Sequence, residues 1–200
     1  MLTDDFTPIE FNFDDLNLNF SLENYLVETP TNTNIASRVP TVPAHLNRVF
    51  MGCFAIIPRK LLNYGAFKLW KNSADPATTA EIANIMKCYI LNNYDFITTA
   101  PASKDRDPSN YCCHKLCEEL SRQTNIPFLQ CFKQRTKKRT HGIFSSLAQE
   151  PVNFLDDVWF QRKTVLFIDD MITSRTTAIN CSKALFDRKC HVDGLIFSYW

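Results

Sequence analysis

The feature that most constrains the fold is a short apolar run followed at once by two aspartates. Val165–Ile168 are four consecutive apolar residues, too few for a helix and typical of a buried strand. Asp169 and Asp170 stand where this strand should end, and a helical pattern begins at Thr176. The stretch therefore predicts a strand, a loop and a helix, with two carboxylates at the carboxyl end of the strand.

The loop between the aspartates and the helix is rich in hydroxyl groups. In an open α/β sheet, ligands bind just beyond the carboxyl ends of the strands. A loop that opens a helix there offers free backbone N–H groups and the positive helix end to a phosphate. The neighbouring carboxylates are acceptors that suit sugar hydroxyls. This combination predicts a site for a phosphorylated ribose.

The same stretch resembles the signature of type I phosphoribosyltransferases, an apolar strand and an acidic pair before a loop of the form T-T-G-x-T. The match runs through Ile168, Asp169, Asp170, Thr173, Ser174 and Thr177. The resemblance implies that Asp169 and Asp170 are catalytic residues that bind the ribose hydroxyls of phosphoribosyl pyrophosphate. It also implies that the 5′-phosphate is bound by the loop residues Thr173, Ser174, Arg175, Thr176 and Thr177.

One position departs from the family pattern, because Arg175 stands where the family has a glycine. Glycine permits positive φ and a close approach of the backbone to a ligand. An arginine at this position either adds positive charge to the phosphate site or prevents the loop from closing around the phosphate. The departure leaves the predicted fold unchanged and makes activity depend on Arg175.

Two other interpretations fit an acidic pair after a strand. Such pairs occur in receiver and phosphatase sites, although receiver domains place the pair at their first strand, whereas this pair lies late in the sequence. The pair also suits a strand–turn–helix that binds no ligand.

A second loop with candidate binding residues is Pro101–Pro108, which follows a predicted strand over Tyr94–Ala100. In type I phosphoribosyltransferases the equivalent loop holds the pyrophosphate of the donor. Within that family the ComF-like subgroup has a proline-rich loop here, a pattern that Pro101, Ser103 and Arg106 follow, and Lys104 lies in the same loop. The arginine–glycine–phenylalanine element that follows in the subgroup is missing. Solvated loop charges are the alternative interpretation.

The segment Lys133–His141 contains five Lys or Arg residues, among them Lys137, Lys138 and Arg139. Three hypotheses remain open for it. It is a solvated loop, a patch that binds nucleic-acid phosphates, or the mobile lid that closes over the pyrophosphate in type I phosphoribosyltransferases and excludes water. Its place one strand before the acidic pair favours the lid.

Eight cysteines occur in a chain whose acidic N-terminus does not resemble a signal peptide, which favours reduced thiols and a cytoplasmic protein. Cys113, His114 and Cys117 share a predicted helix and suggest zinc, but a fourth ligand with convincing spacing is missing. Buried thiols are the alternative. The zinc ribbon of the ComF-like subgroup is missing, because the sequence contains no C-x-x-C.

The charge of the chain is distributed unevenly. Seven acidic residues and no Lys or Arg precede Asn34; since the whole chain carries +1, the remainder carries +8. We expect an acidic arm over residues 1–43, either a tail or a segment that docks on a basic surface or a protein partner. Residues 44–200 should form one phosphoribosyltransferase-like domain. No apolar run approaches the roughly 20 residues that span a bilayer, which predicts no membrane association.

The order of predicted elements indicates an α/β fold with a parallel sheet flanked by helices. Helices are expected from Thr78 or Thr79 to Asn92, over Asn110–Gln123 and over Thr176–Lys189. Further strands are expected over Ile126–Phe132 and His191–Trp200.

Two hypotheses for function follow from these patterns. The resemblance implies an enzyme, a glycosyltransferase that binds phosphoribosyl pyrophosphate with Mg²⁺ and transfers the phosphoribosyl group to an unknown nucleophile with release of pyrophosphate. The alternative is a non-catalytic subunit or effector that binds a protein or nucleic acid, since similar chains resemble components of DNA-uptake and anti-phage systems, including retron effectors. Fold alone does not choose between them.

Overall fold

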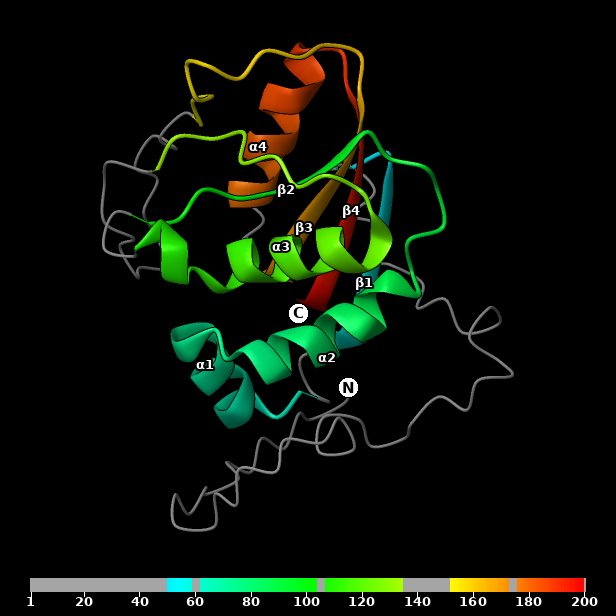
Figure 1. The fold of residues 1–200 in the computed structure, drawn as a ribbon. Helices are drawn as coiled ribbons and strands as arrows, with labels where there is room; N and C mark the ends of the chain where they lie inside the picture. Colours follow the sequence, from blue (N-terminus) through cyan, green and yellow to red (C-terminus); the bar gives the residue numbers. More distant parts are fainter. Residues whose placement is uncertain (1–49, 59–61, 104–106, 135–151, 173–175, 200) are drawn as a thin grey trace, which may run out of the picture.

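The computed structural model describes residues 50–58, 62–103, 107–134, 152–172 and 176–199 (Figure 1). The predicted acidic arm, residues 1–43, lies outside these ranges. The elements in chain order are β1 (Gly52–Pro58), α1 (Tyr64–Ser73), α2 (Pro76–Lys87), β2 (Phe96–Thr99), the 3₁₀ helix η5 (Pro108–Asn110), α3 (Cys112–Thr124), β3 (Thr164–Ile172), α4 (Thr176–Asp187) and β4 (His191–Tyr199).

The strands form one sheet in the order β1-β4-β3-β2, and every neighbouring pair is parallel. Beyond β2, an isolated parallel bridge between Ile97 and Phe128 extends the sheet by one further segment. The predicted α/β class with a parallel sheet is therefore confirmed. The same register runs through all of β3 and β4, from Thr164 opposite His191 to Ile172 opposite Tyr199.

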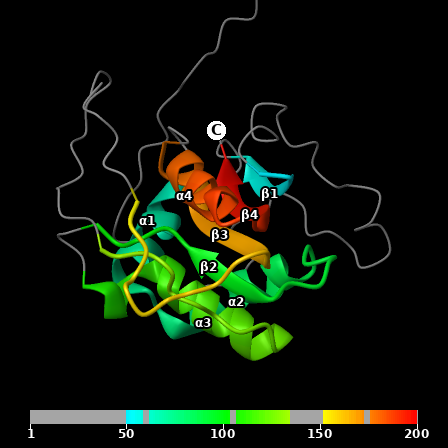
Figure 2. The ribbon, with the colours of Figure 1, turned by 90° about the horizontal axis from the view of Figure 1, so that it is seen from above.

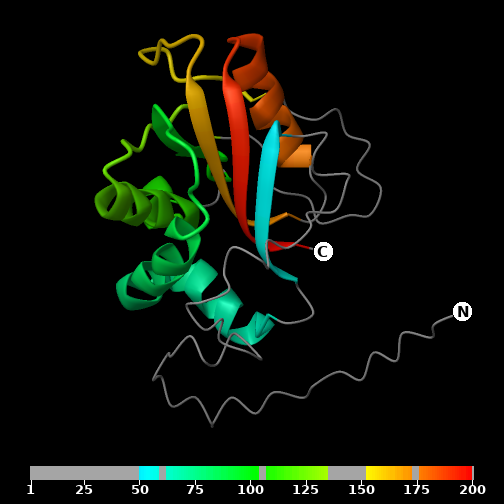
Figure 3. The same ribbon diagram turned by 90° about the vertical axis from the view of Figure 1, so that its right-hand side faces the viewer.

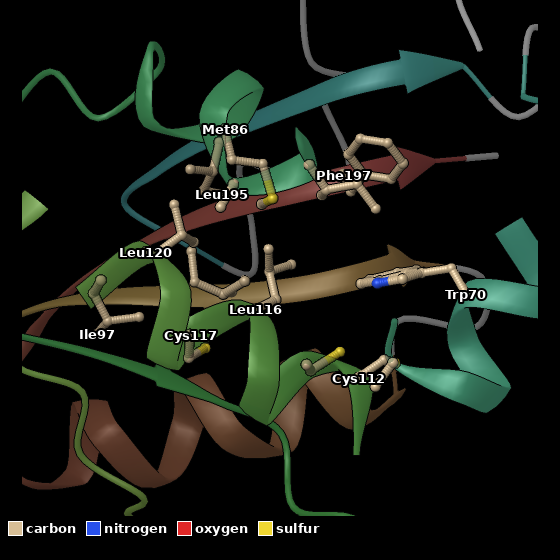
Figure 4. Packing of buried hydrophobic residues seen from close by; sticks show 14 of the residues in the cluster. Trp70, Met86, Ile97, Cys112, Leu116, Cys117, Leu120, Leu195 and Phe197 are labelled. Carbon is tan, nitrogen blue, oxygen red and sulfur yellow. The ribbon is translucent and has the colours of Figure 1, made fainter. Parts of the chain in front are cut away.

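Helices cover both faces of the sheet, with α1, α2 and α3 on one side and α4 on the other (Figures 2 and 3). Strands buried on both faces are apolar without alternation, which explains the continuous Val165–Ile168 run. Alternate residues of this run belong to different hydrophobic clusters: Leu166 packs with the α1–α3 helices, and Phe167 packs with α4. Figure 4 shows Trp70, Met86 and Leu116 in the first of these layers.

Local signals set the helix ends on the α1–α3 side. The Asn63 side chain accepts a hydrogen bond from the Ala66 N–H at 3.2 Å and begins α1, and Ala74 ends it in the left-handed conformation at φ 47°. Asp75 then caps α2 through the Thr78 N–H at 2.9 Å, followed by a proline in the first helical position. Because Ala74 and Asp75 adjoin, α1 and α2 are joined by a tight turn.

Two predicted elements are wrong in extent. The strand expected over Ile126–Phe132 is reduced to isolated bridges at Phe128 and Phe132, and the helix expected to reach Asn92 ends at Lys87. The acidic pair also differs from expectation, because Asp169 and Asp170 lie within β3 rather than after it. The physical reason is the partner strand, since β4 continues to Tyr199 and keeps β3 paired through Ile172.

Among the described residues, no helix is both long enough and apolar enough to cross a bilayer.

Candidate functional site

The candidate site lies at the carboxyl ends of β2 and β3, where the chain reverses its direction across the sheet. From β2 the chain passes through α3 to the bridge at Phe128 on one side; from β3 it passes through α4 to β4 on the other. The crevice at such a switch point is where open α/β sheets bind ligands. Asp169 and Asp170 stand at this end of β3, and both are buried, with 8% and 4% of their surface exposed.

Asp170 is held by groups from three elements. Its Oδ1 accepts a hydrogen bond from the Met171 backbone N–H at 2.8 Å. Its Oδ2 forms an ion pair with the Lys71 ammonium from the last turn of α1. The Cys112 thiol, at the start of α3, lies 3.9 Å from the same oxygen as a weak donor. Asp170 therefore links β3 to α1 and α3, two of the three helices that cover this face.

Asp169 is a buried carboxyl whose pKa is shifted. Its Oδ1 accepts a hydrogen bond from the Asp170 backbone N–H at 2.9 Å. Burial raises the pKa of Asp169 well above its ordinary value, and the adjacent Asp170 charge and hydrogen bond raise it further. Two carboxylates this close do not both ionise readily. The shift favours the protonated form of Asp169, and the ion pair with Lys71 is formed by Asp170.

The Lys71 ammonium remains charged despite its position. Burial lowers the pKa of Lys71, but the Asp170 charge and hydrogen bond together outweigh burial and raise it. Its side chain is 24% exposed, whereas that of Asp170 is 6% exposed. The lysine thus has a route to water on its flexible stem, while the aspartate is fixed on a strand.

The cysteines predicted on one helix all lie in α3 and are fully buried, as the buried-thiol interpretation expected. The side-chain hydrogen bond with Cys112 raises the pKa of Cys113, and burial raises it further; burial also raises the pKa of Cys117. Among the described residues, the group whose ligand atoms converge is Cys112, Cys113 and Asp170, all within 4.8 Å of one another. His114 and Cys117 are not part of it.

Two buried hydroxyls at the same end of the sheet have no hydrogen-bond partner among the described residues, namely Thr99 Oγ1 at the end of β2 and Ser198 Oγ near the end of β4. Thr99 pairs with Ile168 across the ladder, so it is a diagonal neighbour of Asp170. A buried hydroxyl without a partner is costly unless a water or a ligand satisfies it. Thr99 is therefore a polar group at the switch point that no sequence pattern singled out.

The remaining predicted site residues are placed only in part. Thr176 and Thr177 form the first turn of α4 and are half-buried. The Ser103 carbonyl accepts a hydrogen bond from the Gln134 side chain at 3.0 Å, which joins the Pro101 loop to the start of the basic segment. Eight residues lie outside the described ranges: Lys104, Arg106, Lys137, Lys138, Arg139, Thr173, Ser174 and Arg175.

A surface cavity of about 360 Å³ lies away from these residues. Its lining includes Lys87, Asn92 and Tyr94, which precede β2 and therefore lie at the amino ends of the strands. It does not mark the switch point, where the buried carboxylates and unpartnered hydroxyls are.

The functional residues that sequence reasoning missed are Lys71, Cys112 and Thr99. Lys71 is separated from Asp170 by 99 positions, and no local pattern links them. A lysine directly after Trp70, at the end of an apolar helix, was the available signal.

The chain matches no protein-family model, and no curated protein matches it significantly. The assignment of function therefore depends on the residues and the geometry described above.

Proposed function

We propose that this chain is a phosphoribosyltransferase-like protein that binds phosphoribosyl pyrophosphate at the carboxyl ends of β2 and β3. The observation that carries the proposal is the position of Asp169 and Asp170 on β3 beside the topological switch point. Ligands bind in this crevice in open α/β sheets, and paired carboxyl groups accept hydrogen bonds from a sugar diol.

The neighbouring elements supply groups that suit the rest of this ligand. The helix α4 begins at Thr176, and the positive end of a helix favours a phosphate. The Thr99 hydroxyl is available on the adjacent strand. The Ser103–Gln134 hydrogen bond joins the proposed pyrophosphate loop to the basic segment that would serve as the lid.

The proposed reaction is transfer of the phosphoribosyl group to a nucleophile. The bond from the anomeric carbon to pyrophosphate breaks, the lone pair of the nucleophile forms the new bond, and its proton leaves to solvent. The cationic transition state would be stabilised by the Asp170 carboxylate once the ribose has displaced the Lys71 ammonium from it. The carboxyl groups of Asp169 and Asp170 hold the ribose in place.

The carboxyl groups do not form a Mg²⁺ site by themselves. Mg²⁺ takes oxygen ligands and is commonly bound by one or two carboxylates together with substrate phosphates. Asp170 is already paired with Lys71, and the raised pKa of Asp169 makes it a poor ligand. Mg²⁺ would therefore enter with the pyrophosphate of the donor, and the Mg²⁺ requirement stays a prediction.

The Lys71–Asp170 ion pair favours a second candidate function. It occupies the carboxylate that the ribose would need, and burial limits access. A non-catalytic protein that senses a phosphorylated ribose, or a subunit that binds a protein or nucleic acid, needs no turnover at this position. We keep this candidate because the pair is observed and because the family glycine is replaced by Arg175.

Calorimetric titration of the full chain with phosphoribosyl pyrophosphate and Mg²⁺, beside a plain nucleotide and DNA, tests both candidates. We expect Asp170→Asn to weaken donor binding by about tenfold or more, because a charged hydrogen bond contributes roughly 1.5–3 kcal/mol. Asp187→Asn, an exposed position at the end of α4, is the matched control. Equal donor affinity in wild type and Asp170→Asn would overturn the site assignment.

A pyrophosphate-release assay then separates the two candidates. Donor binding with pyrophosphate release supports the transferase, although the acceptor must be supplied from a panel of bases and amines. Donor binding without release supports the sensor. Binding of DNA alone, lost at high salt, favours the nucleic-acid-binding subunit.

A further inference from the structure

Three potential metal ligands meet where α3 begins beside the end of β3. Cys112 and Cys113 are the first two residues of α3, and Asp170 faces them from the strand. Their two Sγ atoms and one carboxylate oxygen all lie within 4.8 Å of one another, and all three residues are buried. Figure 4 shows Cys112 at the start of α3.

The spacing of these atoms suits a tetrahedral metal ion. Zinc–sulfur bonds of about 2.3 Å and zinc–oxygen bonds of about 2.0–2.2 Å place tetrahedral donors roughly 3.5–3.8 Å apart. Cys112 Sγ and Asp170 Oδ2 are 3.9 Å apart before any metal draws them together. Small side-chain rotations would therefore complete the geometry without moving the backbone.

The same three residues already attract a cation. The Lys71 ammonium forms its ion pair with Asp170 Oδ2, the oxygen that faces Cys112. The carboxylate oxygen toward which the two thiols converge thus already holds one positive group in this structure.

We propose that Cys112, Cys113 and Asp170 form a binding site for a divalent ion of the zinc class, which takes the place of the Lys71 ammonium. Two sulfur donors favour zinc and related borderline-soft metals over Mg²⁺ or Ca²⁺, which take oxygen ligands. Three protein ligands leave the fourth tetrahedral position for a water molecule. The unpartnered Thr99 hydroxyl, diagonal to Asp170, gives such a water a neighbour on the protein.

The net charge of the site is the same with and without the metal ion. Without metal, the Asp170 carboxylate and the Lys71 ammonium cancel. With metal, two thiolates and one carboxylate oppose the two charges of the ion and the single charge of Lys71, so the site is again neutral. Two thiol protons leave to the solvent, because only thiolates bind the metal. The 24% exposed Lys71 side chain moves toward water and stays near the site.

This site does not depend on the proposed phosphoribosyl function, although both use Asp170. If both are correct, a bound metal competes with a ribose hydroxyl for Oδ2. Zinc binding without binding of phosphoribosyl pyrophosphate would support the metal site and contradict the proposed donor site.

The test is titration of the full chain with Co²⁺ and Zn²⁺ under a non-thiol reductant, after purification with a chelator. We expect one ion per chain, a thiolate-to-cobalt absorption band, release of two protons on binding, and no competition by excess Mg²⁺. Cys112→Ser and Cys113→Ser should each weaken binding by about 100-fold or more, beyond the effect of losing an outer-shell partner.

Two further variants serve as controls. Cys117→Ser changes another fully buried thiol one turn along α3 and should leave metal affinity unchanged. Lys71→Met removes the competing ammonium and should tighten Zn²⁺ binding by about tenfold or more, since charges this close interact strongly. If a serine variant does not fold, alkylation of wild type supplies the answer, because Zn²⁺ should protect Cys112 and Cys113 and leave the labelling of exposed Cys88 unchanged. The absence of a cobalt–thiolate band, or equal Zn²⁺ affinity in wild type and Cys112→Ser, would overturn the proposal. The cluster would then bind only the Lys71 ammonium.

Discussion

Asp193 and Asp170 are both buried aspartates on neighbouring strands, and they are stabilised in opposite ways. Asp193, on β4, is 3% exposed and accepts hydrogen bonds from the Tyr94 hydroxyl at 3.0 Å and the Asn92 amide at 3.4 Å. The His191 Nε2 lies 3.2 Å away. A Cβ added to Gly52 on β1 would lie 2.9 Å from its Oδ1, so the backbone closes over it as well.

Asp170 has the same burial but few strong donors. Apart from the Met171 N–H it is stabilised by one lysine and one weak thiol donor. The partners of Asp193 are short polar groups that pack around it, whereas the lysine that pairs with Asp170 has a route to water. The comparison teaches that burial does not identify a functional carboxylate; an exchangeable partner does. Asp193 is held by fixed polar partners, whereas Asp170 is the aspartate for which we propose a ligand or a metal ion.

The largest expected effect comes from removing the lysine. Lys71→Met leaves the Asp170 charge buried on a strand that cannot move to water, which should reduce the free energy of unfolding by about 3 kcal/mol, the lower end of the range for a broken buried pair. Asp170→Asn should cost less, about 1 kcal/mol, because Lys71 can extend into solvent. Urea denaturation of both variants measures this asymmetry. Equal losses in the free energy of unfolding would mean that Lys71 reaches water no more easily than Asp170 does.

The second prediction tests the polar partners of Asp193. Tyr94→Phe removes the hydroxyl that donates to Asp193, and a hydrogen bond to a charged group contributes roughly 1.5–3 kcal/mol. Because Asn92 still donates to the same oxygen, we expect a loss of about 1.5 kcal/mol in urea denaturation. Tyr89→Phe is the control, since Tyr89 does not bond Asp193. The affinity for the phosphoribosyl donor and for metal should be unchanged in both variants. A change in either affinity would contradict a purely structural role for Asp193.

The third prediction concerns the proton on Asp169. Burial raises the pKa of Asp169 in the folded state, so its contribution to stability is present below the unfolded pKa of about 3.9 and is lost as pH rises through the folded pKa. Asp169→Asn imitates the protonated form and should remove this loss. Stability of the variant relative to wild type should therefore grow by up to about 1.4 kcal/mol per pH unit above pH 4. Denaturation at several pH values checks it, with Asp187→Asn as a control whose difference from wild type should not change with pH.

The two aspartates also show what a sequence can and cannot predict. The β3 strand, the α4 helix and the parallel α/β class follow from local apolar runs and their spacing, and these predictions are confirmed. Asp169 and Asp170 were expected after the strand because the apolar run ends at Ile168. A carboxylate in a buried strand is unfavourable in isolation. That cost is offset by Lys71, which α1 brings from 99 residues away. Such a contact depends on helix packing, which no local pattern specifies.

Asp193 gave no signal at all in the sequence, since it sits alone in an apolar strand. Its partners Tyr94 and Asn92 lie about a hundred residues earlier in the chain. The same holds for Cys112, whose neighbour Cys113 was considered for zinc in a helical set with His114 and Cys117. The structure instead turns Cys112 and Cys113 toward a strand carboxylate. Helical periodicity groups residues on one element, whereas a metal site commonly joins two.

The smallest expected effect comes from an Asp–Lys pair at the opposite end of β3. Lys163 contacts Asp95 at 2.9 Å with side chains 46% and 39% exposed, and Asp95 also accepts the Thr164 backbone N–H at 2.7 Å. Water and salt compete with such a pair, so Lys163→Met should cost about 0.5 kcal/mol or less, and nothing measurable in high salt. Asp95→Ala should cost about 1 kcal/mol, because the Thr164 N–H loses its acceptor.

The pH dependence of this exposed pair has the opposite sign to that of Asp169. The Thr164 N–H, followed by Lys163, lowers the pKa of Asp95, so its contribution is present above the unfolded pKa of about 3.9 and is lost as pH falls through the folded pKa. Asp95→Ala should therefore differ from wild type at pH 6 and approach it in strong acid. A Lys163→Met cost as large as that of Lys71→Met would contradict the comparison, since exposure would then not separate the two pairs.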